Sequence, residues 1–252
     1  MRVFAIGDLH LPGGDVKPMD VFGPHWERHF DRISEDWRAR VREEDIVLIP
    51  GDISWAMQLA DAAQDLRRIA SLPGRVLILR GNHDYWWSSL TQLRECLPPN
   101  MHAIQNDAFD GGEAVFCGTR GWTIPGEAAS AGACGEPVAA STDAQDVKIY
   151  RREALRLEMS LQAAAKLAQG RPIVAMLHYP PVIPECMRAG TEFTRLLSEY
   201  GVSRCVYGHL HGQSARRGFC GEYRGVRYDL VSCDALDFRL LDVTPQTGET
   251  DE

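Results

Sequence analysis

Five apolar runs of strand length end in polar residues of the kind that bind metal ions, and these junctions constrain the fold more than any other feature. They are Gly7-Asp8-Leu9-His10, Gly51-Asp52, Gly81-Asn82-His83-Asp84, Leu177-His178-Tyr179-Pro180-Pro181 and Gly208-His209-Leu210-His211. A glycine at such a point lets the chain turn sharply and approach an ion without a Cβ clash. Ligands of open α/β sheets bind just outside the carboxyl ends of the strands, so all five junctions can meet at one place.

Between these junctions the chain alternates strand-like and helix-like patterns. Apolar runs predict strands over residues 2–6, 45–49, 75–79, 173–177 and 204–207. Apolar residues three and four apart predict helices over residues 59–71, 147–168 and 191–200, and another from Phe22 to Val41. This alternation is typical of βαβ units around a parallel core, and therefore of an α/β fold.

The middle and the end of the chain differ from this pattern. Residues 101–104 and 114–117 suggest short strands with hairpin-type turns such as 110–112, while residues 226–233 and 238–243 suit antiparallel strands. We expect a single domain over residues 1–244, a long loop at about residues 121–146 and a polar tail at 245–252. The length and the Ala, Gly, Ser and Pro content of the loop lead to the hypothesis that it is a lid over the site.

The overall charge argues against a partner that is recognised through a basic surface. Asp and Glu number 35 against 27 Lys and Arg, which gives a net charge of −8. A protein that binds long nucleic acid through its surface field is expected to be basic, so no such partner is expected here. A substrate that carries phosphate would have to be attracted by a local positive charge.

The cysteines and the apolar segments bear on location. The seven cysteines include no C-x-x-C pair, which indicates free thiols in a reducing compartment rather than a disulfide framework. The first apolar run is too short for a signal peptide, and no later run is long enough to span a membrane. We therefore expect a cytoplasmic protein without a membrane partner.

The residue types at the junctions suit metal coordination. Asp8 and His10 are two residues apart, as are His209 and His211, so in an extended chain each pair leaves the same face. Oxygen and nitrogen donors without thiolates suit Mn, Fe, Co, Ni or Zn in an open site. A single Gly-Asp or Asp-x-His at a strand end is commonly structural; the argument for a binuclear metal site rests on the whole set.

The order Asp-x-His, Gly-Asp, Gly-Asn-His-Asp, His, Gly-His-x-His resembles the motifs of the calcineurin-like metallophosphoesterase superfamily. The resemblance extends from Gly7 to His211 and implies a β-sandwich of two mixed sheets flanked by helices, an α/β/β/α arrangement. It implies that two divalent metal ions share Asp52 as a bridge. One ion would be held by Asp8, His10, Asp52 and His211, and the other by Asp52, Asn82, His178 and His209.

The same resemblance implies hydrolysis of a phosphomonoester or phosphodiester by a water that bridges the two metals. Two divalent cations with Asp8 and Asp52 leave a net positive centre, which would attract a small phosphorylated substrate and lower the pKa of the shared water towards ~7. His83 would lie near the leaving group or the phosphoryl oxygens, and His83 and Asp52 are therefore the expected catalytic residues.

The sequence departs from one branch of this superfamily. The protein Ser/Thr phosphatases continue into Val-Asp-Arg-Gly and Gly-Asn-His-Glu, whereas this chain has Ile53 after Asp52 and Asp84 after His83. A protein phosphatase is therefore not expected, and His83 lacks the usual orienting acid. Arg120 and Arg188 are candidates for phosphate contact, with a surface or structural role as the alternative.

Six aromatic residues near the expected ligands have two interpretations. They either form a rim that stacks on a flat substrate group or pack the loops around the metals. For Trp55 packing is favoured. The six are Trp55, Tyr85, Trp86, Trp87, Trp122 and Tyr179.

Two other functions remain open at this stage. A nuclease could use the same binuclear site, although the chain has no basic stripe. A non-catalytic scaffold of the same fold is the second alternative, but such a protein is expected to lose ligands, and all seven are present here.

Overall fold

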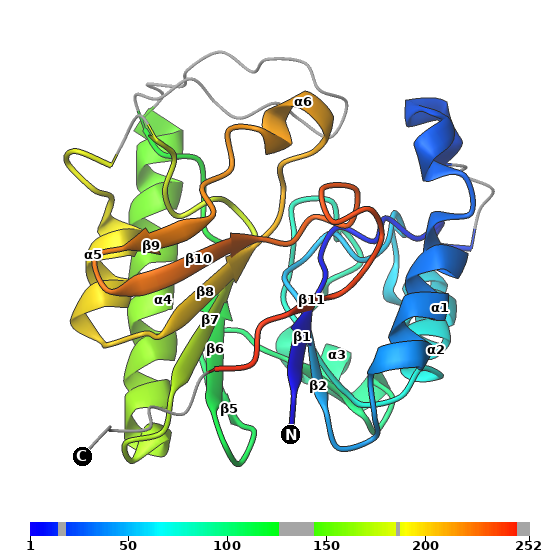
Figure 1. Ribbon diagram of the computed structural model, residues 1–252, viewed down its shortest axis with the longest axis horizontal. Helices are drawn as coiled ribbons and strands as arrows, with labels where there is room; N and C mark the ends of the chain where they lie inside the picture. The colour runs from blue at the N-terminus through cyan, green and yellow to red at the C-terminus, as the bar shows by residue number, and fades with distance from the viewer. Residues whose placement is uncertain (15–18, 126–143, 185–186, 246–252) are drawn as a thin grey trace.

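The computed structural model describes residues 1–14, 19–125, 144–184 and 187–245. Its strands form two sheets that face each other between two sets of helices (Figure 1). The helices α1 (His29–Arg40), α2 (Leu59–Ala70) and α3 (Leu90–Cys96) cover one side, and α4 (Ala144–Ala168) and α5 (Glu192–Glu199) cover the other. The expected α/β/β/α arrangement of two mixed sheets is confirmed.

The first sheet has the strand order β11-β1-β2-β3-β4. Its strands are β1 (Val3–Ala5), β2 (Ile46–Ile49), β3 (Arg75–Ile78), β4 (Met101–Ala103) and β11 (Leu241–Asp242). The four strands from β1 to β4 are parallel, and β11 joins β1 in the antiparallel direction. The parallel strands read as continuous apolar runs because both of their faces are buried.

The second sheet has the order β5-β6-β7-β8-β10-β9. Its strands are β5 (Ala108–Asp110), β6 (Val115–Thr119), β7 (Ile173–Leu177), β8 (Arg204–Tyr207), β9 (Gly221–Tyr223) and β10 (Val226–Leu230). The inner four are parallel, and β5 and β9 are antiparallel edge strands. A turn at residues 110–112 joins β5 to β6, as the sequence predicts.

Three apolar layers hold these elements together. One lies between the first sheet and α1 to α3, and includes Ile33, Trp37 and Leu66. A second lies between the other sheet and α4 and α5, and includes Leu157 and Phe193. The third lies between the two sheets, so the sheets form a sandwich with an apolar interior.

Two expectations about individual elements need correction. The helix predicted from Phe22 to Val41 is broken: Phe22 and Trp26 lie in the 3-10 turns η1 (Met19–Phe22) and η2 (Pro24–Trp26), and α1 begins only at His29. Gly23 has a φ of 128° and is followed by proline, which together stop a continuous helix. Residues 226–230 are antiparallel to β9, as predicted, but parallel to β8.

The predicted loop at residues 121–146 is shorter at its end, because residues 144–146 are the first turn of α4. Its described ends lie close together, since the indole nitrogen of Trp122 donates to Asp146 over 3.1 Å. The rest of the proposed lid, residues 126–143, and most of the predicted tail lie outside the described residues.

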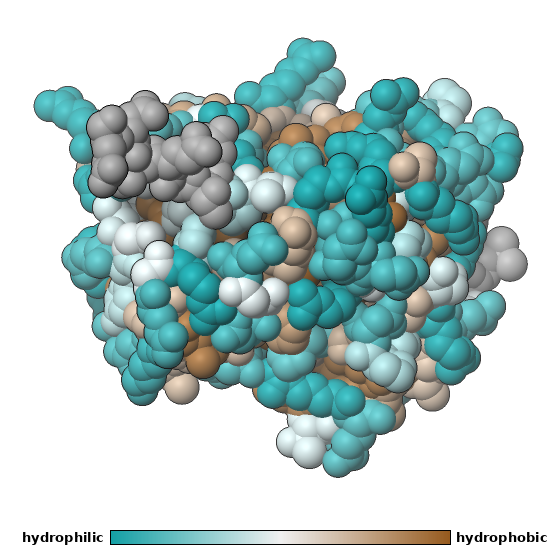
Figure 2. Space-filling model, turned by 60° about the horizontal axis from the view of Figure 1, so that its bottom comes forward, coloured by the Kyte–Doolittle hydropathy of each residue, from teal (hydrophilic) through white to brown (hydrophobic). Residues whose placement is uncertain are grey.

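The parallel strands of both sheets direct their carboxyl ends towards the upper part of Figure 1, where the short helix α6 (Gly212–Ala215) follows β8. Figure 2 shows the molecule with the bottom of Figure 1 turned towards the viewer. On this face hydrophilic residues predominate and hydrophobic ones are scattered. No helix of the described segments has the length and apolar character that crossing a membrane requires.

Candidate metal centre

The seven predicted ligands converge at the carboxyl ends of five strands. Asp8 and His10 follow β1, Asp52 follows β2 and Asn82 follows β3, all from the first sheet. His178 follows β7, and His209 and His211 follow β8, from the second sheet. All except the half-buried Asn82 are buried. The site is thus assembled from both layers of the sandwich.

The backbone at this site is held in a conformation that side-chain-bearing residues rarely adopt. Asp8, His10, Asp52 and His209 have φ values of 58°, 45°, 52° and 73°. Non-glycine residues in this left-handed region cost about 1–3 kcal/mol each and cluster at functional sites. The surrounding loops therefore stabilise a strained geometry that aims four polar side chains at one point.

Two glycines of the strand-end junctions, Gly81 and Gly208, leave space for the carboxylates of ligands from other strands. A Cβ at Gly81 would lie 2.8 Å from the Cγ of Asp52, and its nearest neighbour would be the Oδ1 of that same carboxylate. A Cβ at Gly208 would meet the carboxylate of Asp8 in the same way. At both positions a Cβ atom would lie too close to the neighbouring carboxylate, so only glycine fits at these two junctions.

His178 shows the arrangement most clearly. Its Nδ1 lies 3.0 Å from the carbonyl oxygen of Pro50, which can only accept, so Nδ1 carries the proton. Its Nε2 then faces the Oδ1 of Asn82 at 2.6 Å and the Oδ2 of Asp52 at 3.5 Å. Burial, followed by neighbouring positive charges, lowers the pKa of His178 to about 3. A neutral imidazole therefore directs its lone pair towards two oxygen acceptors, a contact that a cation between them would make favourable.

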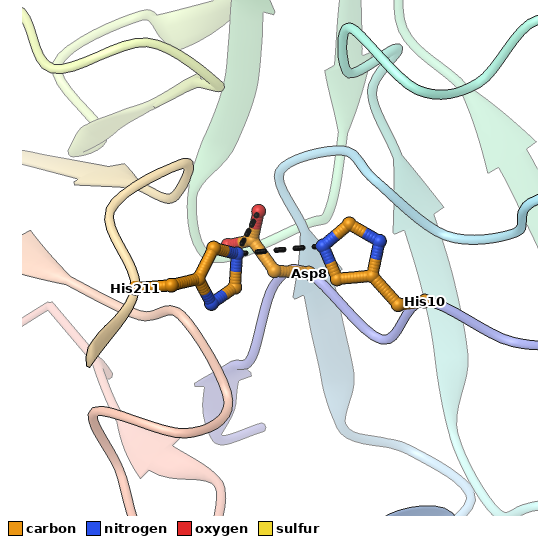
Figure 3. A group of neighbouring side chains, drawn as sticks. All are labelled: Asp8, His10 and His211. Carbon is orange, nitrogen blue, oxygen red and sulfur yellow. Dashed lines mark hydrogen bonds and ion pairs between the residues drawn. The ribbon is translucent and has the colours of Figure 1, made fainter. Parts of the chain in front are cut away.

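A second cluster lies around Asp8, and Figure 3 shows its side chains directed at one another. The Nε2 of His211 is 3.5 Å from Oδ1 of Asp8 and 3.4 Å from Nε2 of His10. Burial lowers the pKa of His211, but hydrogen bonds and charges of Asp234 and Asp8 outweigh it and raise the pKa to about 10. The pKa of His10 is well below its usual value, because of burial and then the charge of His211.

Asp52 contacts both clusters. Its Oδ2 lies 3.5 Å from Nε2 of His178 and 3.8 Å from Nε2 of His10, while Oδ1 accepts from the backbone N–H of His83 over 2.8 Å. Burial, and then the charges of Asp8 and Asp84, raise its pKa well above the usual value. Two carboxylates this close, without a cation nearby, oppose each other's ionisation. Their position fits positive ions at the centre, and Asp52 lies where a bridging ligand is predicted.

Within the described segments, two groups of three His and Asp residues have ligand atoms within 4.8 Å of one another: Asp8, His10 and His211, and Asp8, Asp52 and His178. Both groups contain Asp8, whereas the sequence assigns the shared position to Asp52. The separations above place Asp52 next to members of both groups. The donors are carboxylate oxygens, an amide oxygen and imidazole nitrogens, a set that fits divalent Mn, Fe, Co, Ni or Zn.

Asp84 is held by hydrogen bonds that connect two loops of the site. Its carboxylate accepts hydrogen bonds from the backbone N–H groups of Asp52, Ile53, Ser54 and Gly81 and from the indole of Trp86. It thereby joins the loop after β2 to the loop after β3. Burial raises its pKa to about 6 despite these donors.

His83 lies at the edge of this centre. Its ring is 4.5 Å from that of Trp55 and 5.7 Å from that of His10, measured between centroids. Its Nδ1 has no hydrogen-bond partner among the described residues. This agrees with the sequence, which lacks the acid that usually orients this histidine. Burial lowers its pKa below the usual value.

The aromatic residues divide between the two interpretations. Trp86, Trp87 and Tyr179 are buried and pack the loops. Trp55 stacks on His10 with ring centroids 4.8 Å apart, so it supports a predicted ligand. Tyr85, at 53% exposure, is the most exposed of the six, and Trp55 and Trp122 are half-buried.

Two supporting residues were missed from the sequence. The carboxylate of Asp234 lies 2.8 Å from Nδ1 of His211 and accepts from the backbone N–H of Gly212. His29 donates from Nε2 to the carbonyl oxygen of Leu9, between two predicted ligands, over 2.9 Å. Asp234 is itself an acid shortly after a strand, β10, and that is the signal by which it could have been found.

A family model described as calcineurin-like phosphoesterase matches residues 1–213. No curated protein showed a match. Among solved structures, a phosphopantetheinyl hydrolase from Mycobacterium tuberculosis is 15% identical with a TM-score of 0.55, covering 98% of this chain and 96% of that one. A Thermus thermophilus protein, TT1561, is 14% identical with a TM-score of 0.58, covering 96% and 98%. At these identities the likeness concerns the fold alone.

Proposed function

Because the chain belongs to the calcineurin-like phosphoesterase family, and is therefore a phosphoester hydrolase, we propose that it hydrolyses a small organic phosphoester with two divalent metal ions. One ion is held by Asp8, His10, Asp52 and His211, and the other by Asp52, Asn82, His178 and His209. Residues 1–244 act as a single catalytic domain in this proposal.

The observation that carries the proposal is the convergence of seven oxygen and nitrogen donors, six of them buried, from five strand ends. Nε2 of His178 and Oδ1 of Asn82 face each other there over 2.6 Å, and a cation between them would make this contact favourable. When bound, two divalent ions supply Lewis-acid charge and lower the pKa of a coordinated water.

The protein's own side chains have separate roles in this proposal. Asp52 would be shared by both ions, and its carboxylate is itself held by the backbone N–H of His83. Pro50 and Asp234 fix the ring orientations of His178 and His211 through their Nδ1 atoms. The ring of His83, at the edge of the centre, directs an N–H group at the phosphoryl oxygens or the leaving group.

A small organic substrate is favoured over a nucleic acid by the surroundings of the site. The chain carries a net charge of −8, which opposes a long polyanion. The exposed ring of Tyr85 lies beside that of His83, with ring centroids 6.2 Å apart. An exposed aromatic ring beside a positive centre suits a phosphate ester with an organic group.

The test is a substrate panel with the purified full-length protein. p-Nitrophenyl phosphate, bis-p-nitrophenyl phosphate, cyclic nucleotides, a phosphopantetheine ester and single-stranded DNA are compared with Mn, Co, Ni and Zn. We expect metal-dependent turnover of a monoester or a diester and little digestion of DNA. Preferred digestion of DNA would favour the nuclease, and inactivity with every metal and ester would favour the scaffold.

Variants at two buried aspartates separate the proposed bridge from a general effect on folding. Asp52→Asn removes the bridging charge and is expected to abolish turnover. Asp65→Asn removes the charge of a buried aspartate outside the ligand set, and this variant is expected to retain turnover. Near-normal turnover of Asp52→Asn would contradict the bridge.

A further inference from the structure

A cavity of about 230 Å³ lies beside the metal centre and is lined by arginines. Its charged wall residues are Arg80 after β3, Arg120 after β6, and Arg152, Glu153 and Arg156 of α4, and the amides of Gln105 and Asn106 after β4 also line it. We call this cavity the arginine pocket. It is smaller than the ~300–1,000 Å³ typical of organic ligand sites and suits a small ion or a single ionic group.

The arginine pocket has an excess of positive charge. Four arginines face one carboxylate there, a net of three positive charges in a chain whose total is −8. Glu153 accepts from Arg156 over 2.7 Å and from the hydroxyl of Thr119 over 2.8 Å. Arg152 and Arg120 lie 3.7 and 4.0 Å from the same carboxylate, which cannot neutralise all of them.

Two polar atoms in these walls have no hydrogen-bond partner among the described residues. The buried Nε of Arg80 donates to nothing in the described part of the chain, and the buried Oδ1 of Asn106 accepts from nothing there. A buried donor or acceptor left unpaired is costly, so such atoms point to an absent partner. A hydrogen phosphate ion has acceptor oxygens for arginine and one O–H for the amide oxygen.

Mutual repulsion of the arginines also favours a bound anion. Arg152 and Arg156 are four residues apart on α4, a spacing at which like charges repel. A bound anion would relieve this repulsion.

The arginine pocket and the metal centre share backbone segments. Arg80 is two residues before the predicted ligand Asn82. The carbonyl oxygen of Arg120 accepts from the backbone N–H groups of His178 and Tyr179, over 3.1 and 2.9 Å. The two sites are therefore neighbours, although no predicted ligand lines the arginine pocket.

We propose that the arginine pocket binds a phosphate group at a site distinct from the metal centre. The group is either a second phosphate of the substrate or a free phosphate ion. The first of these sources rests on the proposed function, whereas binding itself does not.

Binding is tested by titrating inorganic phosphate into the metal-free, full-length protein and following the heat. We expect saturable binding to the wild type. Arg80→Gln and Arg152→Gln should each weaken it about tenfold or more, as expected for the loss of a charged hydrogen-bond donor. Arg151→Gln, which removes the same charge from an exposed neighbour on α4 outside the arginine pocket, should change it less than about twofold.

Absence of phosphate binding to the wild type, or an equal effect of Arg151→Gln and Arg152→Gln, would overturn the proposal. Because metal is absent, this failure leaves the proposed phosphoesterase function untouched. Arg152 is exposed, so its variant keeps the test valid if Arg80→Gln does not fold.

The source of the phosphate is separated with the metal-loaded enzyme. A bisphosphate and a monophosphate with the same leaving group are compared in wild type and Arg152→Gln. A fall in kcat/KM for the bisphosphate alone supports a second substrate phosphate. Unchanged kcat/KM for both, with weakened phosphate binding, supports a free ion. An equal fall for both substrates would mean that the variant disturbs the metal centre, and would contradict a distinct site.

Discussion

Replacing Gly81 by alanine tests directly whether the carboxylate of Asp52 is a metal ligand. The added Cβ would lie 2.8 Å from Cγ of Asp52 and closer still to Oδ1, below any distance that real Cβ atoms keep. The carboxylate or the loop must retreat by about 1 Å, several times the ~0.2 Å within which metal–ligand distances are held. We expect metal affinity to fall by at least the ~10–100-fold seen when a supporting residue is lost.

The same substitution has a cost in stability that must be measured separately. Overpacking of this kind typically lowers the free energy of unfolding by about 1–3 kcal/mol. Urea unfolding of the metal-free protein gives this term, and calorimetric titration with Mn gives the metal affinity. Gly81 does not have a positive φ, so the effect is due to the steric clash rather than to backbone strain.

Gly111→Ala is the matched control. Its Cβ would meet Cε2 of Phe116 at 2.5 Å and Cδ1 of Ile46 at 2.9 Å, at the opposite end of the strands. We expect a similar loss of stability with unchanged metal affinity. Gly208→Ala, which would crowd the carboxylate of Asp8, should behave like Gly81→Ala. Wild-type metal affinity in a folded Gly81→Ala protein would refute the argument that Asp52 is held in place for an ion.

Three further predictions concern the supports of the site and its charge. Asp234→Ala should weaken metal binding about 10–100-fold while the protein stays folded, since it frees the ring of His211; calorimetric titration measures this, and unchanged affinity would contradict the role. Removing metal with EDTA should lower Tm, and adding Mn at 100 times its Kd should restore about 2.7 kcal/mol; a Tm indifferent to both would count against the site. Asp65 accepts from Ser54 and Gly13 through one oxygen, which an asparagine can replace, and burial raises its pKa above 3.8. Ionisation of Asp65 therefore destabilises the folded state as pH rises from about 3.8 through the raised pKa. In urea unfolding, the free energy of unfolding of Asp65→Asn should rise relative to that of the wild type between pH 4 and pH 7. A relative fall over this range would refute the reasoning.

The strand-end junctions were the part of the site that the sequence could predict. Each combines a short apolar strand with a turn residue, so its place in the sheet is a local property. Asp8 and Asp52 are brought together for this reason, since neighbouring parallel strands end at one edge of their sheet, and His178 joins them from the facing sheet. Whether they coordinate two ions as expected stays a prediction.

The elements that were predicted wrongly depend on features that the spacing of apolar residues does not reveal. The aromatic stripe from Phe22 to Val41 continues through Gly23 and Pro24, and those two breakers outweigh the periodicity. An alternating pattern such as that of β10 indicates a half-buried strand but not its direction, which here is set by two different neighbours. Asp234 was missed because its role depends on a contact with His211, 23 residues away.

Both sheets contribute side chains to the centre, and this has a mechanical consequence. The backbone N–H of Gly7, after β1, donates to the carbonyl oxygen of Val231, after β10, so the layers are also tied by a main-chain bond beside the site. Ions held there would cross-link the sandwich and resist shear of one sheet over the other. Conversely, an ill-fitting substitution in the apolar interior between the sheets, at Phe116 or Val206 for example, would change the spacing of the ligands without touching any of them.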